Sequence, residues 1–486
     1  MNEEIRDLEP KVVWSNFADL NAVPRPSKKE ERVIAFMKEF GKNLGLETIE
    51  DSAGNVIVKK PATQGMEDRK TVVLQSHLDM VHQKNNDTDF DFSTQGIEMF
   101  VDGDWVCAKG TTLGADNGLG VATIMAILQS DDIPHPALEA LFTIDEETGM
   151  TGAKNLDEDI LEGEILLNLD TEEDDEIGIG CAGGIDITAT RSYKEESVTG
   201  ASQAYKITVK GLNGGHSGMD IIKGLGNANK MMNRFLFNAC IKNAIRVAEI
   251  KGGGLRNAIP RESNALVVVE EKNVKAFLAE SSVLIEAIKS EYASLEENLT
   301  IEITPVASPD KMMEIGVQEE VLKAVYAAAN GVYRMSPDIE GLVETSNNIA
   351  KVNVEKGKIE ILCLTRSSVE SNKWDLANSL CSAFELAGFE VVSDGDYPGW
   401  APNRDSVILK VLDGLYQKLN GEKANIAACH AGLECGIIGS HYPKMDMISF
   451  GPTIRGAHSP DERASISSLQ KFWKFVQEVL KNIPKK

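Results

Sequence analysis

Several segments of the sequence place acids or histidines beside glycines or at the ends of apolar runs. In residues 113–120, Asp116 is the only charged residue among glycines and mostly apolar neighbours. Glycine permits sharp backbone turns and lets a ligand approach the chain closely. A carboxylate held in such a loop could direct one oxygen to each of two cations. The alternative is that Asp116 merely caps the helix expected over residues 121–128.

Three apolar runs that predict buried strands each end in side chains able to bind metal. The runs and the residues that follow them are 71–76 with His77 and Asp79, 137–144 with Glu146 and Glu147, and 164–169 with Asp170. Because strands alternate with helical patterns here, we expect a doubly wound, mostly parallel sheet of the α/β class. In such sheets, active groups gather beyond the carboxyl ends of the strands. The sequence therefore predicts that these side chains share one site.

Imidazoles and carboxylates without a cysteine ligand form the donor set of a catalytic zinc, cobalt or manganese centre. Grouping several carboxylates in a dry site costs Coulomb energy, which nearby positive charge must offset. Two divalent cations about 3.5–4 Å apart would supply that charge, polarise a carbonyl and bind the attacking water. Each motif alone is commonly a solvated turn, so the prediction depends on their shared position at strand ends.

Two pairs of neighbouring residues can divide the work of this site. His77 and Asp79 lie two apart on an extended segment, so both can face the same side. One would bind metal, and the other would orient an imidazole. Glu146 and Glu147 are adjacent and cannot point the same way. One of them would bind metal, and the other would take a proton from the attacking water and pass it to the leaving amine.

The sequence pattern changes near residue 184 and returns near residue 400. Strand and helix patterns between these positions predict an α+β insert of two similar, ferredoxin-like halves, the second expected to begin with the strand at residues 299–303. The sequence thus predicts a discontinuous catalytic domain, residues 1–183 and 400–486, around an inserted lid domain, residues 184–399. Residues 27–30 also match a capping box that would begin an amphipathic helix.

The composition limits the partners of the chain. Its 486 residues include 50 basic and 75 acidic side chains, a formal net charge of -25. This charge argues against nucleic acid and anionic membranes as partners. We expect no signal peptide and no membrane span, because no basic segment with an apolar core begins the chain and no apolar run is long enough. Scattered cysteines without a CxxC pair are typical of a reducing compartment, so we expect a cytoplasmic protein.

Taken together and in order, the motifs resemble the aminoacylase/carboxypeptidase G family of two-zinc hydrolases. They are HLDMV at 77–81, GADNG at 114–118, DEETG at 145–149, NLDTEE at 168–173 and GAHS at 456–459. The likeness covers nearly the whole chain, including residues 430–436. It implies two divalent metal ions, zinc first, with cobalt or manganese able to substitute.

The resemblance also implies roles for the site residues. His77 and Asp170 would hold one zinc, Glu147 and His458 the other, and Asp116 would bridge them. Asp79 would steady the His77 imidazole, and Glu146 would be the general base and acid. The Asp116–Asn117 peptide is often cis in this family.

Three residues of the insert match positions that act on the substrate in this family. His216, in residues 214–218, matches the lid histidine that helps hold the oxyanion, and Asn257 lies in the lid asparagine motif. Arg366 stands where relatives place an arginine for the substrate carboxylate, which a guanidinium binds with two parallel hydrogen bonds. Many relatives have an acid two residues before this arginine, whereas this chain has Leu364.

The resemblance implies a cytosolic metallo-dipeptidase that cleaves Xaa-His dipeptides, including carnosine, and acts as a homodimer. An N-acyl amino acid deacylase or a broad-specificity dipeptidase would use the same chemistry. The metal ligands do not distinguish these activities, whereas the substrate pocket of the lid would. A metal-binding protein on an inactivated scaffold should lack a ligand or the general base, and the sequence retains all of them. A binuclear phosphoesterase would need a GNH(D/E) segment, which the sequence lacks.

Overall fold

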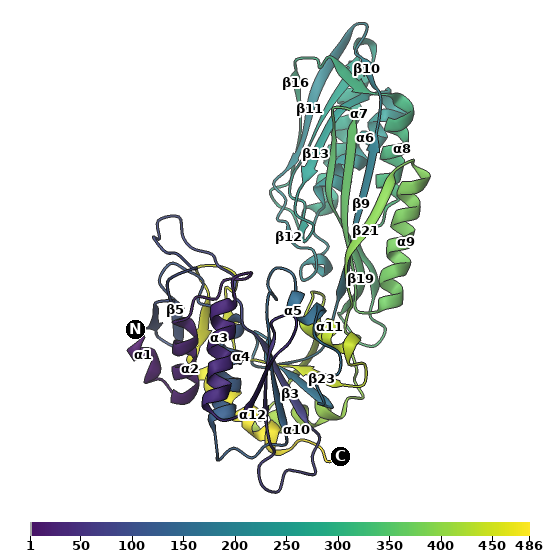
Figure 1. The fold of residues 1–486 in the computed structure, drawn as a ribbon. Coiled ribbons are helices and arrows are strands. Elements are labelled where there is room, and N and C mark those ends of the chain that lie inside the picture. Colours follow the sequence, from purple (N-terminus) through teal and green to yellow (C-terminus); the bar gives the residue numbers. More distant parts are fainter. Residues whose placement is uncertain (1) are drawn as a thin grey trace. The chain divides into compact units, whose positions relative to one another are not determined.

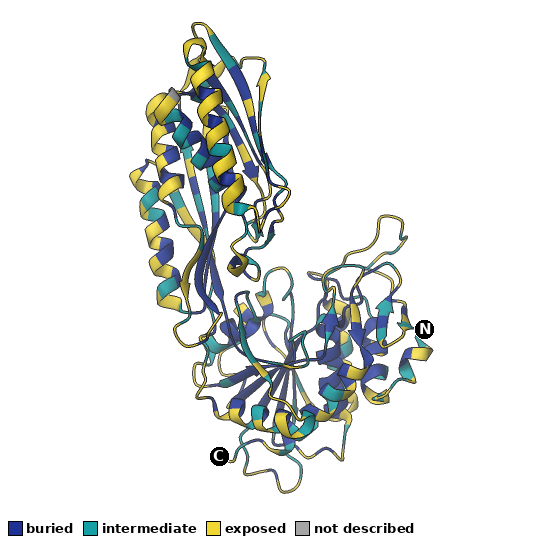
Figure 2. Cartoon of the chain, turned by 180° about the vertical axis from the view of Figure 1, so that it is seen from behind, coloured by how far each residue is buried: buried dark blue, intermediate teal, exposed yellow. Residues whose placement is uncertain are grey.

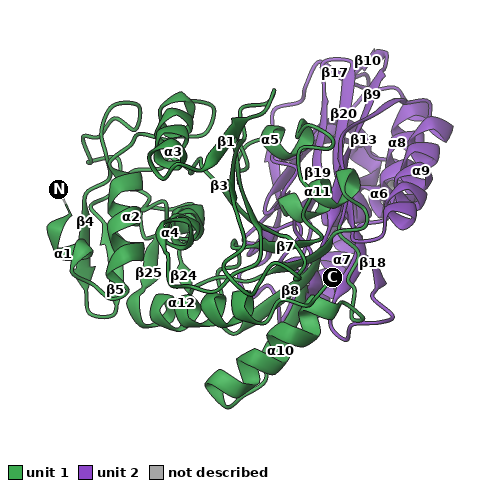
Figure 3. Cartoon of the chain, turned by 60° about the horizontal axis from the view of Figure 1, so that its bottom comes forward, with its two compact units in different colours: residues 1–180, 400–428, 433–486 green, residues 181–399, 429–432 purple. Residues whose placement is uncertain are grey.

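The computed structural model describes residues 2–486 and divides into two compact units (Figures 1 and 3). Unit 1 runs to Gly180 and continues through Trp400–Ala428 and Leu433–Lys486, while unit 2 comprises Cys181–Gly399 and Cys429–Gly432. The sequence analysis placed residues 429–432 with the first domain, but the structure groups them with unit 2. In unit 2, the Ala182 backbone N–H donates to the carbonyl oxygens of Cys429 and Ala431, with N···O distances of 3.2 and 2.9 Å.

An eight-stranded sheet forms the centre of unit 1, in the order β1–β2–β6–β3–β7–β23–β8–β22. The strands are β1 (Glu47–Glu50), β2 (Val56–Lys60), β6 (Leu138–Thr143), β3 (Val72–His77), β7 (Ile165–Asn168), β23 (Asp446–Ser449), β8 (Glu176–Cys181) and β22 (Asn425–Cys429). The four central strands, β6, β3, β7 and β23, pair in parallel, whereas β1, β2 and β8 pair antiparallel at the sides. Every residue of β3, β6 and β7 is buried, as parallel strands covered on both faces require. The predicted doubly wound, mostly parallel sheet is therefore confirmed at its centre.

Helices and a small sheet complete unit 1. The helices are α1 (Glu3–Arg6), α2 (Lys11–Asn21), α3 (Glu31–Asn43), α4 (Ala115–Gln129), α5 (Thr151–Lys154), α10 (Val407–Asn420), α11 (Glu434–His441) and α12 (Ile466–Lys481). Helix α4 packs on β3 and α2, and α10 packs on β23 and α12. The small sheet has the order β24–β25–β5–β4, formed by Ile454–Arg455, Arg463–Ser465, Trp105–Ala108 and Met99–Asp102. It carries the loop that contains His458.

The capping box predicted for residues 27–30 is wrong. Helix α3 begins at Glu31, and its N-cap residue Glu30 makes no side-chain cap bond in the described chain. Ser27 instead donates its hydroxyl proton to Asp79 Oδ2 at 2.8 Å, and Glu30 accepts the backbone N–H of Lys28. The motif therefore lies against the acid that follows β3 rather than capping a helix.

A nine-stranded antiparallel sheet forms unit 2, in the order β16–β11–β15–β13–β19–β20–β9–β21, with β18 paired to β19. The strands are β9 (Gly183–Ser192), β11 (Ser202–Lys210), β13 (Arg246–Gly253), β15 (Ser263–Glu270), β16 (Thr300–Val306), β18 (Gly331–Met335), β19 (Val343–Glu355), β20 (Lys358–Ser367) and β21 (Glu390–Tyr397). The helices α6 (Ala228–Asn243), α7 (Val274–Tyr292), α8 (Ile315–Ala327) and α9 (Glu370–Leu386) lie on one face of this sheet, their outer sides exposed (Figure 2). Two short ladders add β10 (Glu195–Ser197) with β17 (Lys311–Met313), and β12 (Gly215–His216) with β14 (Ala258–Ile259).

Unit 2 consists of two ferredoxin-like halves, as the sequence predicted. One half runs β11–α6–β13–β15–α7–β16, and the other runs β9–α8–β19–β20–α9–β21. Pairing of β13 with β19 joins the halves into one sheet. The first half is inserted between β9 and α8 of the second. The strand at residues 299–303, predicted to open the second half, therefore closes the first as part of β16.

Asn227 links the two halves of unit 2. Its Oδ1 caps α6, and its Nδ2 donates to Asn348 Oδ1 and the Ile349 carbonyl, both on β19. We expect Asn227→Ala to lower the free energy of unfolding by about 2–3 kcal/mol, because it removes a cap and leaves buried acceptors unpaired. Urea unfolding followed by circular dichroism would measure the change.

Asn238→Ala is the matched control on the same helix. The Asn238 side chain donates to the Arg234 carbonyl within α6, so its removal should change stability by less than about 0.5 kcal/mol. Equal unfolding midpoints for the two variants would contradict the proposed link.

Candidate metal centre

Five proposed ligands from separate segments converge at the carboxyl ends of the parallel strands of unit 1. His77 ends β3, Asp170 follows β7, Glu147 follows β6, Asp116 lies in the first turn of α4, and His458 lies between β24 and β25. Their ligating atoms form two groups of three, His77 with Asp116 and Asp170, and Asp116 with Glu147 and His458. Within each group the atoms lie within 4.8 Å of one another. Asp116 belongs to both groups.

Asp116 turns one carboxylate oxygen to each group. His77 Nε2 lies 3.2 Å from Asp116 Oδ1 and 3.6 Å from Asp170 Oδ1. His458 Nε2 lies 3.2 Å from Asp116 Oδ2 and 3.1 Å from Glu147 Oε2. The Asp116–Asn117 peptide is cis, as the family resemblance implied.

The side chains of this cluster fit divalent cations. Glu147 Oε1 and Asp170 Oδ1 are buried and have no hydrogen-bond partner within residues 2–486. Burying a carboxylate oxygen without a partner is costly, and a cation is the partner that these two oxygens lack. Carboxylates and imidazoles are also the ligands that zinc, cobalt and manganese share.

The carboxylates create a strongly negative environment for both histidines. Hydrogen bonds to Asp116 and Glu147 raise the pKa of His458 to about 11. Burial opposes a charge on His77, but Asp170, Asp116 and Asp79 outweigh it and raise the pKa of His77 well above its ordinary value. A site that attracts protons this strongly attracts metal ions for the same reason.

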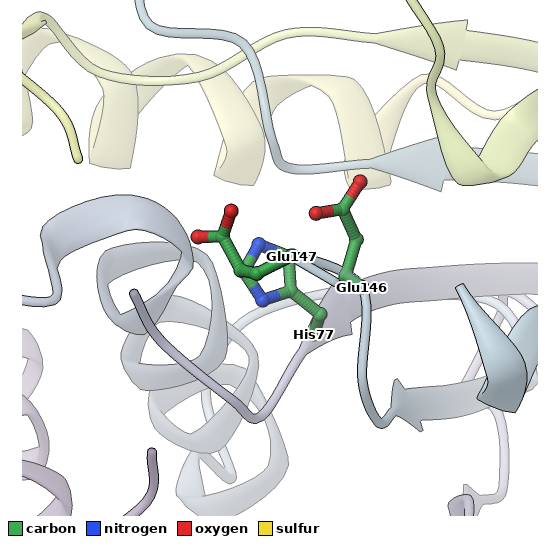
Figure 4. Close-up of side chains that lie close together, drawn as sticks. All are labelled: His77, Glu146 and Glu147. Carbon is green, nitrogen blue, oxygen red and sulfur yellow. The ribbon is translucent and has the colours of Figure 1, made fainter. Parts of the chain in front are cut away.

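Glu146 and Glu147 point in different directions, as expected for adjacent residues (Figure 4). Ligating atoms of His77, Glu146 and Glu147 lie within 4.8 Å of one another. Burial raises the pKa of the Glu146 carboxyl well above its ordinary value, which brings it towards the range useful for proton transfer. The structure therefore brings together the acid pair and the first imidazole.

Asp79 contacts both the imidazole and the acid pair. Its Oδ1 lies 3.4 Å from His77 Nδ1 and accepts the backbone N–H of Glu146 at 3.0 Å, and its Oδ2 accepts that of Glu147 at 3.3 Å. The sequence predicted the imidazole contact alone. The backbone contacts depend on the pairing of β3 with β6, which the motif itself does not contain.

Arg25 is a buried residue of the site that the sequence analysis missed. Its guanidinium donates to the carbonyl oxygens of Leu78, Asp79 and Gly114 at 3.1, 3.0 and 2.6 Å. A Cβ atom at Gly114 or Gly118 would come within 2.5 or 2.6 Å of Arg25 Nη2. These glycines make room for an arginine, whereas the sequence analysis expected them to admit a ligand.

A chain of buried polar side chains crosses the parallel strands beneath the ligands. Glu434 Oε2 accepts from Thr143 Oγ1 at 2.6 Å and from Gln75 Nε2 at 2.7 Å. Asn168 Nδ2 donates to Gln75 Oε1 at 2.6 Å, and Ser449 Oγ donates to Asn168 Oδ1 at 2.5 Å. These bonds join β6, β3, β7 and β23 near their carboxyl ends, and proposed ligands follow or end the first three of these strands. The sequence signal that could have revealed this network is the presence of uncharged polar residues inside otherwise apolar strands.

The three residues predicted to act on substrate lie in unit 2. His216 is in β12, opposite Ala258 of β14, so it lies near Asn257. Arg366 is on β20, is 5% exposed and donates from Nη1 to Tyr397 Oη at 2.8 Å. The structure thus pairs the segments of His216 and Asn257 and buries Arg366 in the sheet.

His430 joins Arg366 in unit 2, although the sequence analysis assigned it no role. Ser346 pairs with Arg366 across β19 and β20, and the Ser346 hydroxyl lies 2.7 Å from His430 Nε2. Burial and the positive charge of Arg366 lower the pKa of His430 to about 3, so its imidazole is neutral.

Comparison with known proteins places this chain in a family. Residues 73–482 match Peptidase family M20/M25/M40. The chain is 43% identical over 483 residues to the cytosol non-specific dipeptidase of Escherichia coli (strain K12). This alignment covers 99% of this chain and 100% of that protein. The crystal structure of aminoacylhistidine dipeptidase from Vibrio alginolyticus is 44% identical, covers 100% of this chain and 99% of its own, and has a TM-score of 0.94.

More distant structures share the fold. Aminopeptidase PepT from Bacillus cereus is 16% identical, with a TM-score of 0.57 over 98% of this chain and 99% of its own. The family match and the two relatives above 40% identity define the chain as a peptide-bond hydrolase. This chain belongs to peptidase family M20/M25/M40, a family of metallopeptidases, which confirms the resemblance found in its motifs. Across residues 2–486, the structure has no helix that is long and apolar enough to cross a membrane.

Metal binding at this centre should release protons. The metal-free protein holds a proton on His458 at about pH 7, because its pKa lies near 11, and a metal-binding imidazole must lose that proton. We therefore expect zinc affinity to rise with pH, since fewer protons then compete for the imidazole. Calorimetry of zinc binding in buffers of different ionisation enthalpy would count the protons released.

His458→Gln should reduce this release by about one proton, because the variant lacks the imidazole that must deprotonate. His82→Gln is the control, since His82 is exposed and outside both ligand groups. Binding heats that do not depend on the buffer would contradict the assignment of His458.

Proposed function

We propose that this chain is a metal-dependent dipeptidase that hydrolyses Xaa-His dipeptides, including carnosine. The observation that carries the proposal is the Asp116 carboxylate, shared between two groups of ligand atoms, with Glu146 beside one of them. The names of the two similar proteins, a non-specific dipeptidase and an aminoacylhistidine dipeptidase, support the substrate class. The cytosolic name of the first supports a cytoplasmic location. A homodimer stays a prediction from the family resemblance.

In this proposal the five ligands would hold two zinc ions, which cobalt or manganese could replace. His77 and Asp170 would hold one ion, Glu147 and His458 would hold the other, and Asp116 would be shared. When bound, the ions polarise the scissile carbonyl and make a water acidic enough to attack at neutral pH.

Glu146 moves the proton. Its carboxylate oxygen takes a proton from the attacking water and then delivers it to the nitrogen of the leaving amine. Burial supports this role because it raises the proton affinity of Glu146 relative to an exposed glutamate. Asp79 holds the backbone of this residue and faces the His77 imidazole, so it positions the base relative to a ligand.

The substrate contacts are assigned to unit 2. His216 donates to the developing oxyanion, Asn257 orients the substrate, and Arg366 binds the free carboxylate of the dipeptide. The Tyr397 hydroxyl accepts one Arg366 N–H, and the buried Arg366 Nε has no partner in the described part of the chain. A buried guanidinium with an unused donor suits an anionic ligand.

A broad-specificity dipeptidase is the second candidate, because the E. coli relative is named as non-specific. Release of free amino acids from Xaa-His dipeptides, other dipeptides and N-acyl amino acids would separate the candidates. We expect the metal-stripped protein to be inactive and added zinc, cobalt or manganese to restore cleavage, with Xaa-His dipeptides and carnosine cleaved. Equal rates on all dipeptides would favour broad specificity, and a preference for N-acyl amino acids would favour a deacylase.

Glu146→Gln should lower kcat by roughly 100- to 10,000-fold, because the amide cannot accept the proton of the attacking water. Metal content, measured by atomic emission, should not change, since Glu146 is not among the proposed ligands. Glu158→Gln makes the same chemical change at an exposed position of unit 1 and should leave kcat unchanged. Full turnover in Glu146→Gln would contradict its role as the base.

A further inference from the structure

Glu462 is a buried acid to which neither the family motifs nor the proposed mechanism assigns a role. It lies four residues after His458 and is 3% exposed. Its carboxylate accepts four successive backbone N–H groups of the Asp116 loop. Oε2 accepts from Leu113 at 2.8 Å and Gly114 at 3.0 Å, and Oε1 accepts from Ala115 at 2.7 Å and Asp116 at 3.2 Å. Both oxygens of Glu462 are therefore committed to this loop.

The loop that carries Glu462 also carries His458. Strands β24 and β25 pair at its two ends, through Ile454 with Ala464 and Arg455 with Arg463, and β25 pairs further with β5. Within this closed loop, His458 Nε2 faces Asp116 Oδ2 at 3.2 Å while Glu462 binds the Asp116 backbone. One short loop thus contacts both the side chain and the main chain of the same aspartate.

Arg25 holds the opposite side of the Asp116 loop. It donates to the Gly114 carbonyl, whereas Glu462 accepts the Gly114 N–H. Arg25 is 1% exposed, and burial lowers its pKa to about 10 while nearby acids, Glu462 first among them, oppose that lowering, so it keeps its charge at neutral pH. The same guanidinium binds the carbonyls of Leu78 and Asp79, directly after His77.

We propose that Glu462 is a positioning residue that fixes Asp116 between the two groups of ligand atoms. The inference rests on the proposed function, because it takes Asp116 as the shared metal ligand. Four successive backbone N–H groups converge on the two carboxyl oxygens of Glu462, and together these hydrogen bonds hold the loop backbone in place. A ligand held in place before the metal arrives loses less freedom on binding, and residues that orient ligands in this way affect metal affinity.

Glu462→Gln tests the proposal directly. The substitution keeps one oxygen but turns an NH₂ group towards two backbone N–H donors, so about half of the hydrogen bonds to the loop are lost. We expect zinc to bind the metal-stripped, full-length variant roughly 10–100-fold more weakly than the parent protein. Competition with a chromophoric zinc chelator would measure the affinity without reference to activity. The visible absorption of the cobalt-loaded variant should also shift, because the geometry of Asp116 changes.

Asp461→Asn is the matched control, because it removes the same charge from the neighbouring, exposed residue of the same loop. It should bind zinc as tightly as the parent protein. Glu462→Asp keeps the charge but shortens the side chain, so it cannot reach all four N–H groups. If circular dichroism shows that Glu462→Gln is unfolded, Glu462→Asp becomes the test variant. We expect Glu462→Asp to bind zinc at least several-fold more weakly than the parent protein.

The outcomes separate this inference from the function on which it rests. If the parent protein binds no zinc, cobalt or manganese, the proposed function fails. If the parent binds metal and a folded Glu462 variant binds it equally well, the positioning role is overturned. Equal weakening in Asp461→Asn would also overturn it, because the effect would then come from the lost charge and not from the hydrogen bonds.

Discussion

The mutual repulsion of buried carboxylates is the constraint on which this structure depends. Asp116, Glu147 and Asp170 are largely buried and lie beside the imidazoles of His77 and His458. At short range and low dielectric, such charges are stable together only with positive charge between them. The neighbouring carboxylates raise the pKa values of His77 and His458, because a protonated imidazole supplies positive charge beside them. The scaffold must therefore hold the acids in place against the repulsion.

Unit 1 holds the acids in place with buried strands and with hydrogen bonds between buried side chains. Parallel pairing brings the carboxyl ends of β3, β6 and β7 to one edge of the sheet. Below that edge, the network of side-chain hydrogen bonds from Glu434 to Ser449 joins these strands. Arg25 connects the end of β3 to the Asp116 loop. Stability and site geometry therefore come from the same hydrogen bonds.

Unit 2 shows how local pattern and topology can diverge. Its halves have the same order of elements, β-α-β-β-α-β, so the sequence predicted two similar units. One half, however, lies within a connection of the other, between β9 and α8. Strand pairing over long separations, such as β9 with β20, assigns each strand to its half. No local feature of residues 299–303 distinguishes the last strand of one half from the first strand of the next.

The sequence by itself determined the class of fold and the residues most suited to bind metal. Apolar runs predict buried strands, and glycines and acids at their ends predict a site, because both signals are local in the chain. Only the tertiary structure decided what surrounds those residues. Ser27 lies against Asp79 instead of capping a helix, and Gly114 makes room for Arg25. Glu462 binds a loop about 350 residues away in sequence, as only a folded chain permits. Hydrogen bonds between distant segments leave no periodic signal in a single sequence, because they depend on where the packed elements bring the chain together.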